Sequence, residues 1–219
     1  MEVLEIEKPE NKKIIVYIIN KENHKLSKVE ARNLGDFLQN CEFNFTTIDL
    51  MGKNLKELNK SPLAKFLEDL LIQFWGVDIP EYAKGYLSEE ISDKKEQINE
   101  LEAEYENLLS NSAEKDSFKA QNLDSWIVLL KDEVNDKENY LKLKVKPQWI
   151  VKKIFDNARA NKTNSLIILH FSPEELVPEI EKLLQEFKIS VIIHNLNTEI
   201  SDRTFSVKNN VITSNQFIK

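Results

Sequence analysis

Strand-forming apolar runs lie at both ends of the chain, and a long charged segment with helical periodicity lies between them. Residues 14–19 (IIVYII) form a continuous apolar run, which is typical of a strand buried on both faces. Ser27 and Glu30 have the spacing of a capping box, and a helical stripe of apolar residues follows them. Residues 43–50 (FNFTTIDL) predict a second strand. Residues 13–50 therefore predict a β-α-β unit.

The C-terminal end repeats this pattern. Residues 166–169 predict a short buried strand, and residues 189–193 predict the next one. Between them, the sequence Ser172-Pro173-Glu174-Glu175 predicts the start of a helix, with a capping serine and proline at the first helical position. Asn209-Asn210 predicts a turn before a last strand at residues 211–217. Short β-α-β connections favour parallel pairing of the strands.

The middle of the chain is predicted to be helical. Residues 55–75 read as helix, with Pro62 starting a second piece, and residues 76–85 read as a break. Residues 87–109 carry a heptad-like apolar seam, which predicts one arm of a helical hairpin that turns at residues 110–115. The returning helix is expected to present an apolar stripe formed by Leu123, Trp126, Ile127, Leu130 and Val134.

These elements predict an α/β fold with a discontinuous head domain. We expect residues 1–53 and 147–219 to share one mostly parallel sheet, and residues 54–146 to form an inserted, charged α-helical projection. Residues 142–146 are compatible with a short strand or with a frayed helix. Trp149 and the apolar residues after it predict a helix that leads into the second half of the head.

Composition and charge limit the possible classes of protein. The formal net charge is −7, which argues against a protein that coats nucleic acid through its overall charge. The one cysteine, Cys41, has no partner in the chain for a disulfide, as expected in a reducing cytoplasm. The N-terminus has no apolar signal core, and no apolar run is long enough to cross a membrane. We therefore expect a cytoplasmic protein that does not contact a membrane.

Charge is distributed unevenly along the chain. Residues 87–109 hold eight carboxylates and two lysines, whereas residues 142–162 hold seven basic residues and one acid. The basic residues of that second segment are Lys142, Lys144, Lys146, Lys152, Lys153, Arg159 and Lys162. Such a segment has enough positive charge to neutralise several phosphates. Solvated helix faces are the alternative explanation for both segments.

Motifs for common chemistries are absent from the sequence. Met51-Gly52-Lys53-Asn54 follows a predicted strand but lacks the first glycine and the hydroxyl of a phosphate-binding loop, and no dinucleotide-binding fingerprint occurs. His24, His170 and His194 are scattered, so with a single cysteine they give no zinc ligand set. The residues by themselves therefore indicate no particular chemistry.

Two alternatives remain open. Asp132, Glu133, Asp136 and Glu138 lie close in sequence to Lys142 and Lys144, so a metal-dependent nuclease is one alternative. The other is a protein-interaction scaffold that uses the acidic heptad helix at residues 87–109 as its docking surface. Carboxylates near the predicted hairpin turn, such as Glu114, Asp116 and Asp124, are of the type that binds Ca²⁺.

The order of elements and their apolar pattern resemble those of a known family over most of the chain. The likeness is carried by the helix WIVKKIFDNARANKTN, the strand SLIILHF, the helix SPEELVPEIEKLLQEF, the strand ISVIIHNLN and the ending FSVKNNVITSNQFIK. The segment LDSWIVLLKDEV is similar to the helix that precedes the return to the head. The family is the Csn-two family of accessory proteins in type II-A CRISPR–Cas systems.

This resemblance implies a non-enzymatic protein. Members of the family form ring-shaped homotetramers that thread double-stranded DNA ends through a basic central hole and bind Ca²⁺. They act in spacer acquisition together with the adaptation integrase and the RNA-guided nuclease. By position, the resemblance makes Lys142, Lys144, Lys146, Lys152, Lys153, Arg159 and Lys162 candidate DNA-binding residues, and it makes Glu114, Asp116, Asp124 and Glu133 candidate calcium ligands.

Overall fold

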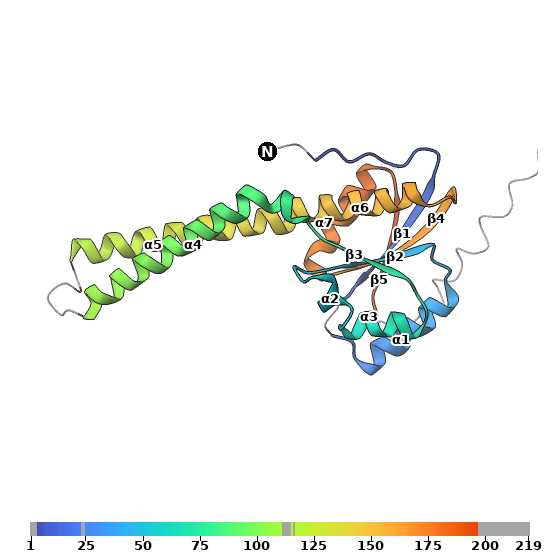
Figure 1. Ribbon diagram of the computed structural model, residues 1–219, viewed down its shortest axis with the longest axis horizontal. Coiled ribbons are helices and arrows are strands. Elements are labelled where there is room, and N and C mark those ends of the chain that lie inside the picture. Colours follow the sequence, from blue (N-terminus) through green and yellow to red (C-terminus); the bar gives the residue numbers. More distant parts are fainter. Residues whose placement is uncertain (1–3, 23–24, 111–114, 116, 197–219) are drawn as a thin grey trace, which may run out of the picture. The chain divides into compact units, whose positions relative to one another are not determined.

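The computed structural model describes residues 4–22, 25–110, 115 and 117–196. Their elements, drawn in Figure 1, are β1 (Lys13–Asn20), α1 (Lys28–Asn40), β2 (Phe45–Asp49), α2 (Leu55–Leu58), α3 (Pro62–Asp69), β3 (Phe74–Val77), α4 (Glu81–Ser110), α5 (Phe118–Tyr140), the π-helix η1 (Leu141–Val145), α6 (Lys146–Ala160), β4 (Ser165–Ser172), the 3₁₀-helix η2 (Glu174–Leu176), α7 (Val177–Glu186) and β5 (Ser190–His194).

The described residues divide into two compact units. A sheet unit comprises Asn11–Gly76, Thr163–Glu174 and residues 189–196. A hairpin unit comprises residues 4–10, Val77–Lys162 and Glu175–Lys188.

A five-stranded sheet with the order β3-β2-β4-β1-β5 forms the base of the sheet unit. β1 pairs in parallel with both β4 and β5, and β2 pairs in parallel with β4. In this register Ile18 of β1 lies opposite His170 of β4 and Ile193 of β5. Strands from both ends of the chain thus share one sheet, which confirms the predicted α/β fold with a mostly parallel sheet.

The inner position of β1 follows from its apolar sequence. Val16, Ile18 and Ile19 are completely buried, and burying one such side chain contributes roughly 1.5–3 kcal/mol. Part of this burial occurs in an apolar cluster that the sheet forms with the helices of the same unit. The cluster joins Ile19, Ile48, Leu169 and Phe171 of the strands to Leu34, Phe37 and Leu38 of α1, Leu58 of α2, and Leu63, Ala64 and Leu67 of α3.

The prediction of a helix through residue 75 is wrong. α3 ends at Asp69, and Phe74–Val77 is strand β3, hydrogen-bonded to β2 at the edge of the sheet. Leu71, with a φ of 59°, has the left-handed conformation that commonly ends a helix. Gly76, expected in a break, lies inside β3, where an added Cβ would come within 2.6 Å of the Leu50 side chain. Tertiary packing therefore overrides the local helical signal here.

The C-terminal elements differ slightly from their predicted bounds. Ser172 is the last residue of β4 and does not cap a helix, because a 3₁₀ turn, Glu174–Leu176, precedes α7. The second proline, Pro178, lies in the first turn of α7, where its missing N–H costs no hydrogen bond. The turn predicted at Asn209-Asn210 and the strand predicted at residues 211–217 lie outside the described residues.

The hairpin unit contains the two long helices α4 and α5, which run antiparallel (Figure 1). Their shared core consists of Ile91 and Ile98 from α4 and Ile127, Leu130 and Val134 from α5. Five ion pairs cross between the helices: Lys94–Glu133, Lys95–Glu138, Lys119–Glu104, Lys131–Glu102 and Lys137–Glu90. Three lysines of α5 thus each neutralise a carboxylate of α4, and Lys94 of α4 has a carboxylate partner on α5.

One residue of the predicted apolar stripe on α5 faces solvent. Trp126 is 58% exposed, whereas Ile127, Leu130 and Val134 are buried. Helical geometry explains the difference, because residue 126 lies 100° before residue 127 around the helix and therefore falls outside the seam with α4. Trp126 therefore lies outside the buried part of the predicted stripe, and its exposure needs another explanation.

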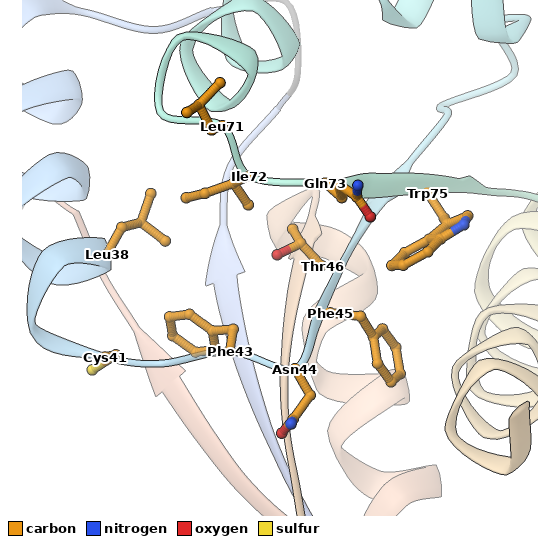
Figure 2. A pocket seen from close by; sticks show the side chains of 10 residues that line it. All are labelled: Leu38, Cys41, Phe43, Asn44, Phe45, Thr46, Leu71, Ile72, Gln73 and Trp75. Atoms are coloured by element: carbon orange, nitrogen blue, oxygen red, sulfur yellow. The ribbon is translucent and has the colours of Figure 1, made fainter. Parts of the chain in front are cut away.

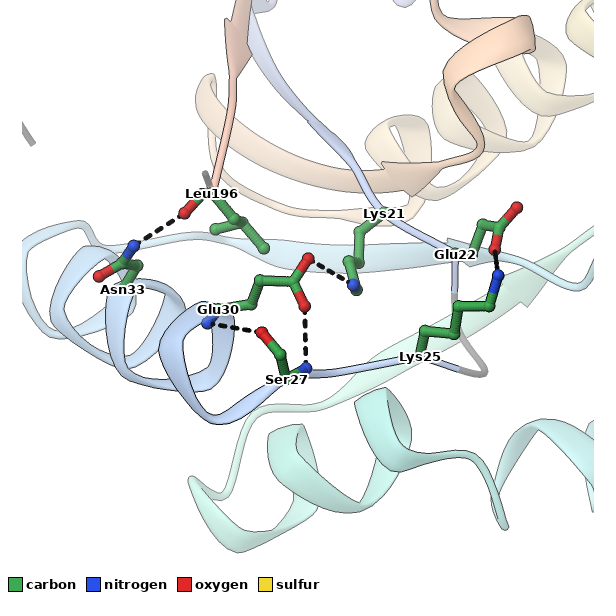
Figure 3. A network of polar contacts seen from close by, with 7 residues as sticks. All are labelled: Lys21, Glu22, Lys25, Ser27, Glu30, Asn33 and Leu196. Atoms are coloured by element: carbon green, nitrogen blue, oxygen red, sulfur yellow. Dashed lines mark hydrogen bonds and ion pairs between the residues drawn. The ribbon is translucent and has the colours of Figure 1, made fainter. Parts of the chain in front are cut away.

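A network of polar contacts connects the end of β1 to the start of α1 (Figure 3). The Ser27 hydroxyl accepts from the Glu30 backbone N–H, and the Glu30 carboxylate accepts from the Ser27 N–H, so the predicted capping box is present. Lys21 donates to the same carboxylate at 2.6 Å. Asn33 donates to the Leu196 carbonyl oxygen at 2.8 Å. The network therefore holds the N-terminus of α1 against the carboxyl end of the sheet.

We expect the Glu30 carboxylate to make stability depend on pH. Burial alone would raise the pKa of Glu30, but its bonds with Lys21 and Ser27 lower it from 4.5 to about 2. Because the folded state has the lower pKa, the stabilisation is present above pH 4.5 and is lost as the pH falls toward 2. Chemical denaturation at a series of pH values measures the free energy of unfolding. The deficit of Glu30→Gln relative to wild type should be largest above pH 4.5.

The stability difference between Glu30→Gln and wild type should then shrink as the pH falls through the window. Glu42→Gln, at an exposed position of the same unit, corrects for the loss of one negative charge. A stability difference that stays constant with pH would contradict the role of the Glu30 carboxylate.

Candidate nucleic-acid interface

The predicted basic residues lie along one stretch of helix and the turn after it. Lys142 and Lys144 belong to η1, the residues from Lys146 to Arg159 belong to α6, and Lys162 follows α6. Lys142, Lys144, Arg159 and Lys162 are exposed, Lys152 and Lys153 are half-buried, and the Lys146 side chain is only 12% exposed. Because all seven belong to the hairpin unit, one binding surface can include most of them.

The π-helix η1 lets α5 continue into α6 at a proline. Pro147 lies in the first turn of α6 and has no N–H to donate. In η1 the Lys146 N–H donates to the Leu141 carbonyl oxygen. Residues 142–146, whose sequence is compatible with a short strand or a frayed helix, are therefore helical. π-Helical turns inside α-helices occur often at functional sites. Here the turn positions Lys142 and Lys144.

Four of the seven basic side chains form ion pairs. Lys142 pairs with Glu175 at 2.6 Å, and Lys144 pairs with Glu179 at 2.9 Å. The hydrogen bond from Lys144 lowers the pKa of Glu179, so this carboxylate stays charged over a wider pH range. The other two pairs are Lys146–Asp78 at 3.5 Å and Arg159–Asp156 at 2.9 Å. Three of these carboxylates lie outside the basic segment, so the folded protein has less uncompensated positive charge there than the sequence indicates.

Two of the basic residues also contact the N-terminal segment. Lys152 donates to the Glu5 carbonyl oxygen at 3.5 Å, and Arg159 donates to the Glu7 carbonyl oxygen at 3.0 Å. Both donors lie on one face of α6, seven residues apart, which is two helical turns. The extended segment therefore runs along this face of α6 and places Glu5 and Glu7 beside it.

The Asp78–Lys146 pair lies where the two arms of the hairpin begin and end. Asp78 directly follows β3, three residues before α4 begins, and Lys146 is the first residue of α6. Both side chains are only 12% exposed, and the rings of Tyr82 and Trp149 meet edge to face nearby in sequence, with centroids 5.9 Å apart. The position of Lys146 assigns it a structural role, in contrast to the other six basic residues.

The predicted calcium ligands do not form one site among the described residues. Glu114 and Asp116 lie outside them. Asp124 and Glu133 are nine residues apart on α5, roughly 13 Å along the helix axis, so they do not bind the same ion. Within the described part of the chain, no group of three or more His, Cys, Asp or Glu residues is placed to hold a metal ion. Calcium binding therefore stays a prediction.

The carboxylates proposed for a nuclease lie on the same helix. Glu133 and Glu138 pair with Lys94 and Lys95 of α4, so both support the hairpin. The hydrogen bond from Lys94 lowers the pKa of Glu133. Because the lysines that bind these two carboxylates come from α4, the sequence neighbours Lys142 and Lys144 are not their partners.

The two histidines at predicted strand ends, His170 and His194, pack against other side chains of the sheet unit. His170 is fully buried, and its Nδ1 lies 3.0 Å from the Thr47 hydroxyl. The His194 ring stacks on Phe37 with centroids 4.2 Å apart, and burial lowers the pKa of His194. At the N-terminus of α1, where phosphates bind in many α/β proteins, Ser27 and Glu30 already satisfy backbone N–H groups.

A scan against protein-family models, a search of the curated proteins and a search of the solved structures each found no match to the chain. The resemblance to the Csn-two family therefore stays a prediction. Within the described residues, no helix is both long enough and apolar enough to cross a membrane.

Sequence reasoning missed the residues that control the charge of this surface. Glu175 and Glu179 lie about 35 positions after their lysine partners, on η2 and α7. Nothing in the local sequence connects the two segments, since the pairing depends on how α7 packs beside η1 and α6. The only available signal was the acidic cluster at the start of the predicted C-terminal helix.

We expect the removal of these two carboxylates to strengthen DNA binding if Lys142 and Lys144 contact phosphates. The double change Glu175→Gln and Glu179→Gln frees both lysines, and each new phosphate contact should steepen the salt dependence of binding by about 0.9 in log–log slope. Both ion pairs are largely exposed, so the substitutions should change stability little. Fluorescence anisotropy with linear duplex DNA at several salt concentrations measures the effect.

The control is the double change Glu181→Gln and Glu186→Gln on the same helix, which alters net charge equally and leaves both ion pairs in place. Equal salt slopes for the two double variants would show that Lys142 and Lys144 do not contact DNA.

Proposed function

We propose that the protein is a non-catalytic, sequence-independent binder of double-stranded DNA ends that acts in CRISPR spacer acquisition as a ring-shaped homotetramer. Its partners in this role would be the adaptation integrase and the RNA-guided nuclease. The observation that carries the proposal is the architecture: strands from both ends of the chain form one parallel sheet, and the chain between them forms an antiparallel helical hairpin. This is the arrangement that the family resemblance implies.

The surface of η1 and α6 supports phosphate binding. Its lysines and arginine lie on a helix and not on a loop, so their spacing is fixed before DNA arrives. Contacts of this kind to phosphates hold the duplex without reading its sequence. The ion pairs of Lys142 and Lys144 are exposed, and exposed pairs are weak enough to exchange a carboxylate for a phosphate. Binding should therefore weaken steeply as the salt concentration rises.

A second apolar stripe on α5 supports self-association. Phe118, Trp126 and Leu129 are 78%, 58% and 57% exposed, and they lie within 80° of one another around the helix. Phe118 and Trp126 line a hollow of about 410 Å³ together with Leu101 and Leu123. Large apolar side chains on one exposed face are typical of a surface that another protein covers. A second copy of the hairpin offers a matching surface, as symmetric assembly requires.

Charge reversal on α6 tests the DNA-binding part of the proposal. The triple change Lys152→Glu, Lys153→Glu and Arg159→Glu should abolish binding to linear duplex DNA, because it replaces three candidate phosphate contacts with repulsive charges. Anisotropy at low salt measures binding, and circular dichroism on heating verifies the fold.

The matched control changes Lys56, Lys60 and Lys65 to Glu. These three exposed lysines lie on or beside α2 and α3, so net charge changes by the same amount away from α6. Loss of binding in both triple variants would attribute the effect to overall charge, and retained binding in the α6 variant would remove that helix from the interface. Competition by linear but not by covalently closed DNA tests the preference for ends.

Substitution within the stripe tests self-association. The double change Trp126→Glu and Leu129→Glu should convert the oligomer to smaller species in sedimentation velocity, because it buries two charges without partners in the interface. DNA affinity should fall as well, since each subunit alone contributes fewer phosphate contacts.

Val128 provides the control for this experiment. It is 52% exposed on the same helix but lies about 80° or more away from the stripe. Val128→Glu should leave the assembly intact. A wild-type protein that is a monomer in sedimentation velocity and does not bind DNA at low salt would favour the alternative of a protein-interaction scaffold.

A further inference from the structure

The chain before β1 lies along the face of α6 that carries Lys152 and Arg159. Residues 4–9 of this segment, dark blue in Figure 1, belong to neither a helix nor a strand, so no strand pairing holds them in place. The segment and α6 are parts of the same compact unit. Its contacts therefore decide which basic side chains of the proposed DNA-binding surface are accessible.

Buried and exposed side chains alternate along the segment. Leu4 and Ile6 are half-buried, whereas Glu5 and Glu7 are exposed. Successive side chains of an extended chain point to opposite sides, so the alternation indicates that one side of the segment faces the protein. The two apolar side chains therefore help to hold the segment in place, and the two carboxylates lie on its outer side.

The main chain of the segment engages the hydrogen-bond donors of two basic side chains. The carbonyl oxygens of Glu5 and Glu7 accept from Lys152 at 3.5 Å and from Arg159 at 3.0 Å. The other terminal nitrogen of Arg159 donates to Asp156 at 2.9 Å. An arginine binds a phosphate best through two parallel hydrogen bonds, and here both terminal nitrogens already have acceptors.

The charge of the segment acts in the same direction. The residues whose carbonyl oxygens accept these bonds, Glu5 and Glu7, each bring a carboxylate close to the two basic side chains. A DNA phosphate that approaches Lys152 or Arg159 therefore meets negative charge at short range, which repels it. The segment thus opposes phosphate binding by occupying the donors and by its charge.

The segment is held weakly enough for DNA to displace it. The Lys152 bond of 3.5 Å is at the long limit for a hydrogen bond. The Arg159 side chain is 41% exposed, and interactions of exposed charged groups contribute little to stability. The segment stays joined to β1, so after release it remains close to α6 at a high effective concentration. It is therefore a competitor that DNA must displace and that returns when DNA leaves.

We infer that residues 4–8 are an autoinhibitory strap that competes with DNA phosphates for Lys152 and Arg159. The inference rests on the proposed DNA-binding function. With the strap closed, these two side chains are occupied; with the strap released, both can bind phosphates. Only molecules with a released strap bind DNA through them, so the apparent affinity is lowered in proportion to the released fraction.

Loosening the strap should strengthen DNA binding by the full chain. The double change Leu4→Ser and Ile6→Ser keeps the net charge and removes the two apolar side chains that face the protein. Fluorescence anisotropy with linear duplex DNA at low salt should show a higher affinity than wild type, by about tenfold where one wild-type molecule in ten has an open strap.

The matched control is the double change Val29→Ser and Leu71→Ser, at two exposed apolar positions of the sheet unit. Leu71 borders a hollow whose lining residues carry no charge (Figure 2), so the control removes apolar side chains without altering a candidate phosphate site. The control should bind DNA with the affinity of wild type.

The outcomes separate the strap from the proposed function. Equal affinities of wild type and the loosened variant would overturn the strap and leave DNA binding in place. Binding by the loosened variant alone would support both. Binding by neither protein would overturn the proposed function, and the role of the strap with it.

Cleavage by a glutamate-specific protease gives a second measurement, which needs no variant. Cleavage after Glu5 and Glu7 requires the strap to leave α6, so its rate relative to cleavage after the exposed Glu42 follows the open fraction. Saturating linear DNA should raise this relative rate severalfold, because DNA and the strap compete for the same donors. A rate that stays the same or falls would show that the strap remains closed beneath DNA, which would overturn the inference.

The contacts that hold the strap are tested without DNA. The double change Lys152→Gln and Arg159→Gln should raise the relative cleavage rate, because it weakens the contacts to the Glu5 and Glu7 carbonyl oxygens. The control, Lys153→Gln with Lys162→Gln, removes the same charge from side chains that donate no hydrogen bond to the described part of the segment. Equal cleavage rates in the two double variants would show that Lys152 and Arg159 do not hold the strap.

Discussion

The fold depends on the parallel pairing of β1 with β4, because these strands come from opposite ends of the chain. Beside them Lys12 donates a hydrogen bond to the Thr163 carbonyl oxygen, 151 positions later. Parallel strands require a crossover connection, and here most of the chain serves as that connection. The entropy cost of closing a loop rises only slowly with its length, so a long insertion is tolerated provided that it folds on itself. The antiparallel helices α4 and α5 meet this condition.

Because the inserted hairpin must close on itself, one of its basic residues, Lys146, is held in an ion pair and is not free to bind a ligand. The Asp78–Lys146 pair joins the segment that enters the hairpin to the helix that leaves it. Breaking a largely buried pair by removing one partner leaves an uncompensated charge, so Lys146 is not available to a ligand without loss of stability. Lys142 and Lys144, four and two residues before it on the helix, have exposed partners and can still exchange them for a ligand. Neighbouring lysines that look equivalent in sequence therefore differ in how readily they can leave their partners.

Patterns within one element predicted much of the fold. The apolar run of β1, the capping box at Ser27 and the seam of the hairpin all appear in the structure, because each depends on residues close in sequence. The prediction of helix over residues 55–75 includes Phe74 and Trp75, whereas pairing with β2 makes these two residues strand. The predicted apolar stripe of the returning helix includes Trp126, because spacing alone does not fix the width of the part that is buried. The partners of the basic residues depend on tertiary packing, and the acidic cluster at the start of the predicted C-terminal helix does not say which lysines it meets.

The ion pairs also connect the two parts of the proposed function. Lys146 is paired with Asp78, and Lys152 and Arg159 already donate hydrogen bonds to backbone carbonyl oxygens. One subunit can therefore form only a few phosphate contacts without breaking an existing interaction. Each contact to a phosphate contributes modestly, and its contribution falls with salt. Useful affinity for DNA then requires several subunits acting on one duplex, since linked sites bind more tightly than any single site. If this surface binds DNA as proposed, self-association through α5 is therefore a condition for that binding, and this is why substitutions at Trp126 and Leu129, away from every basic residue of α6, should reduce the affinity for DNA.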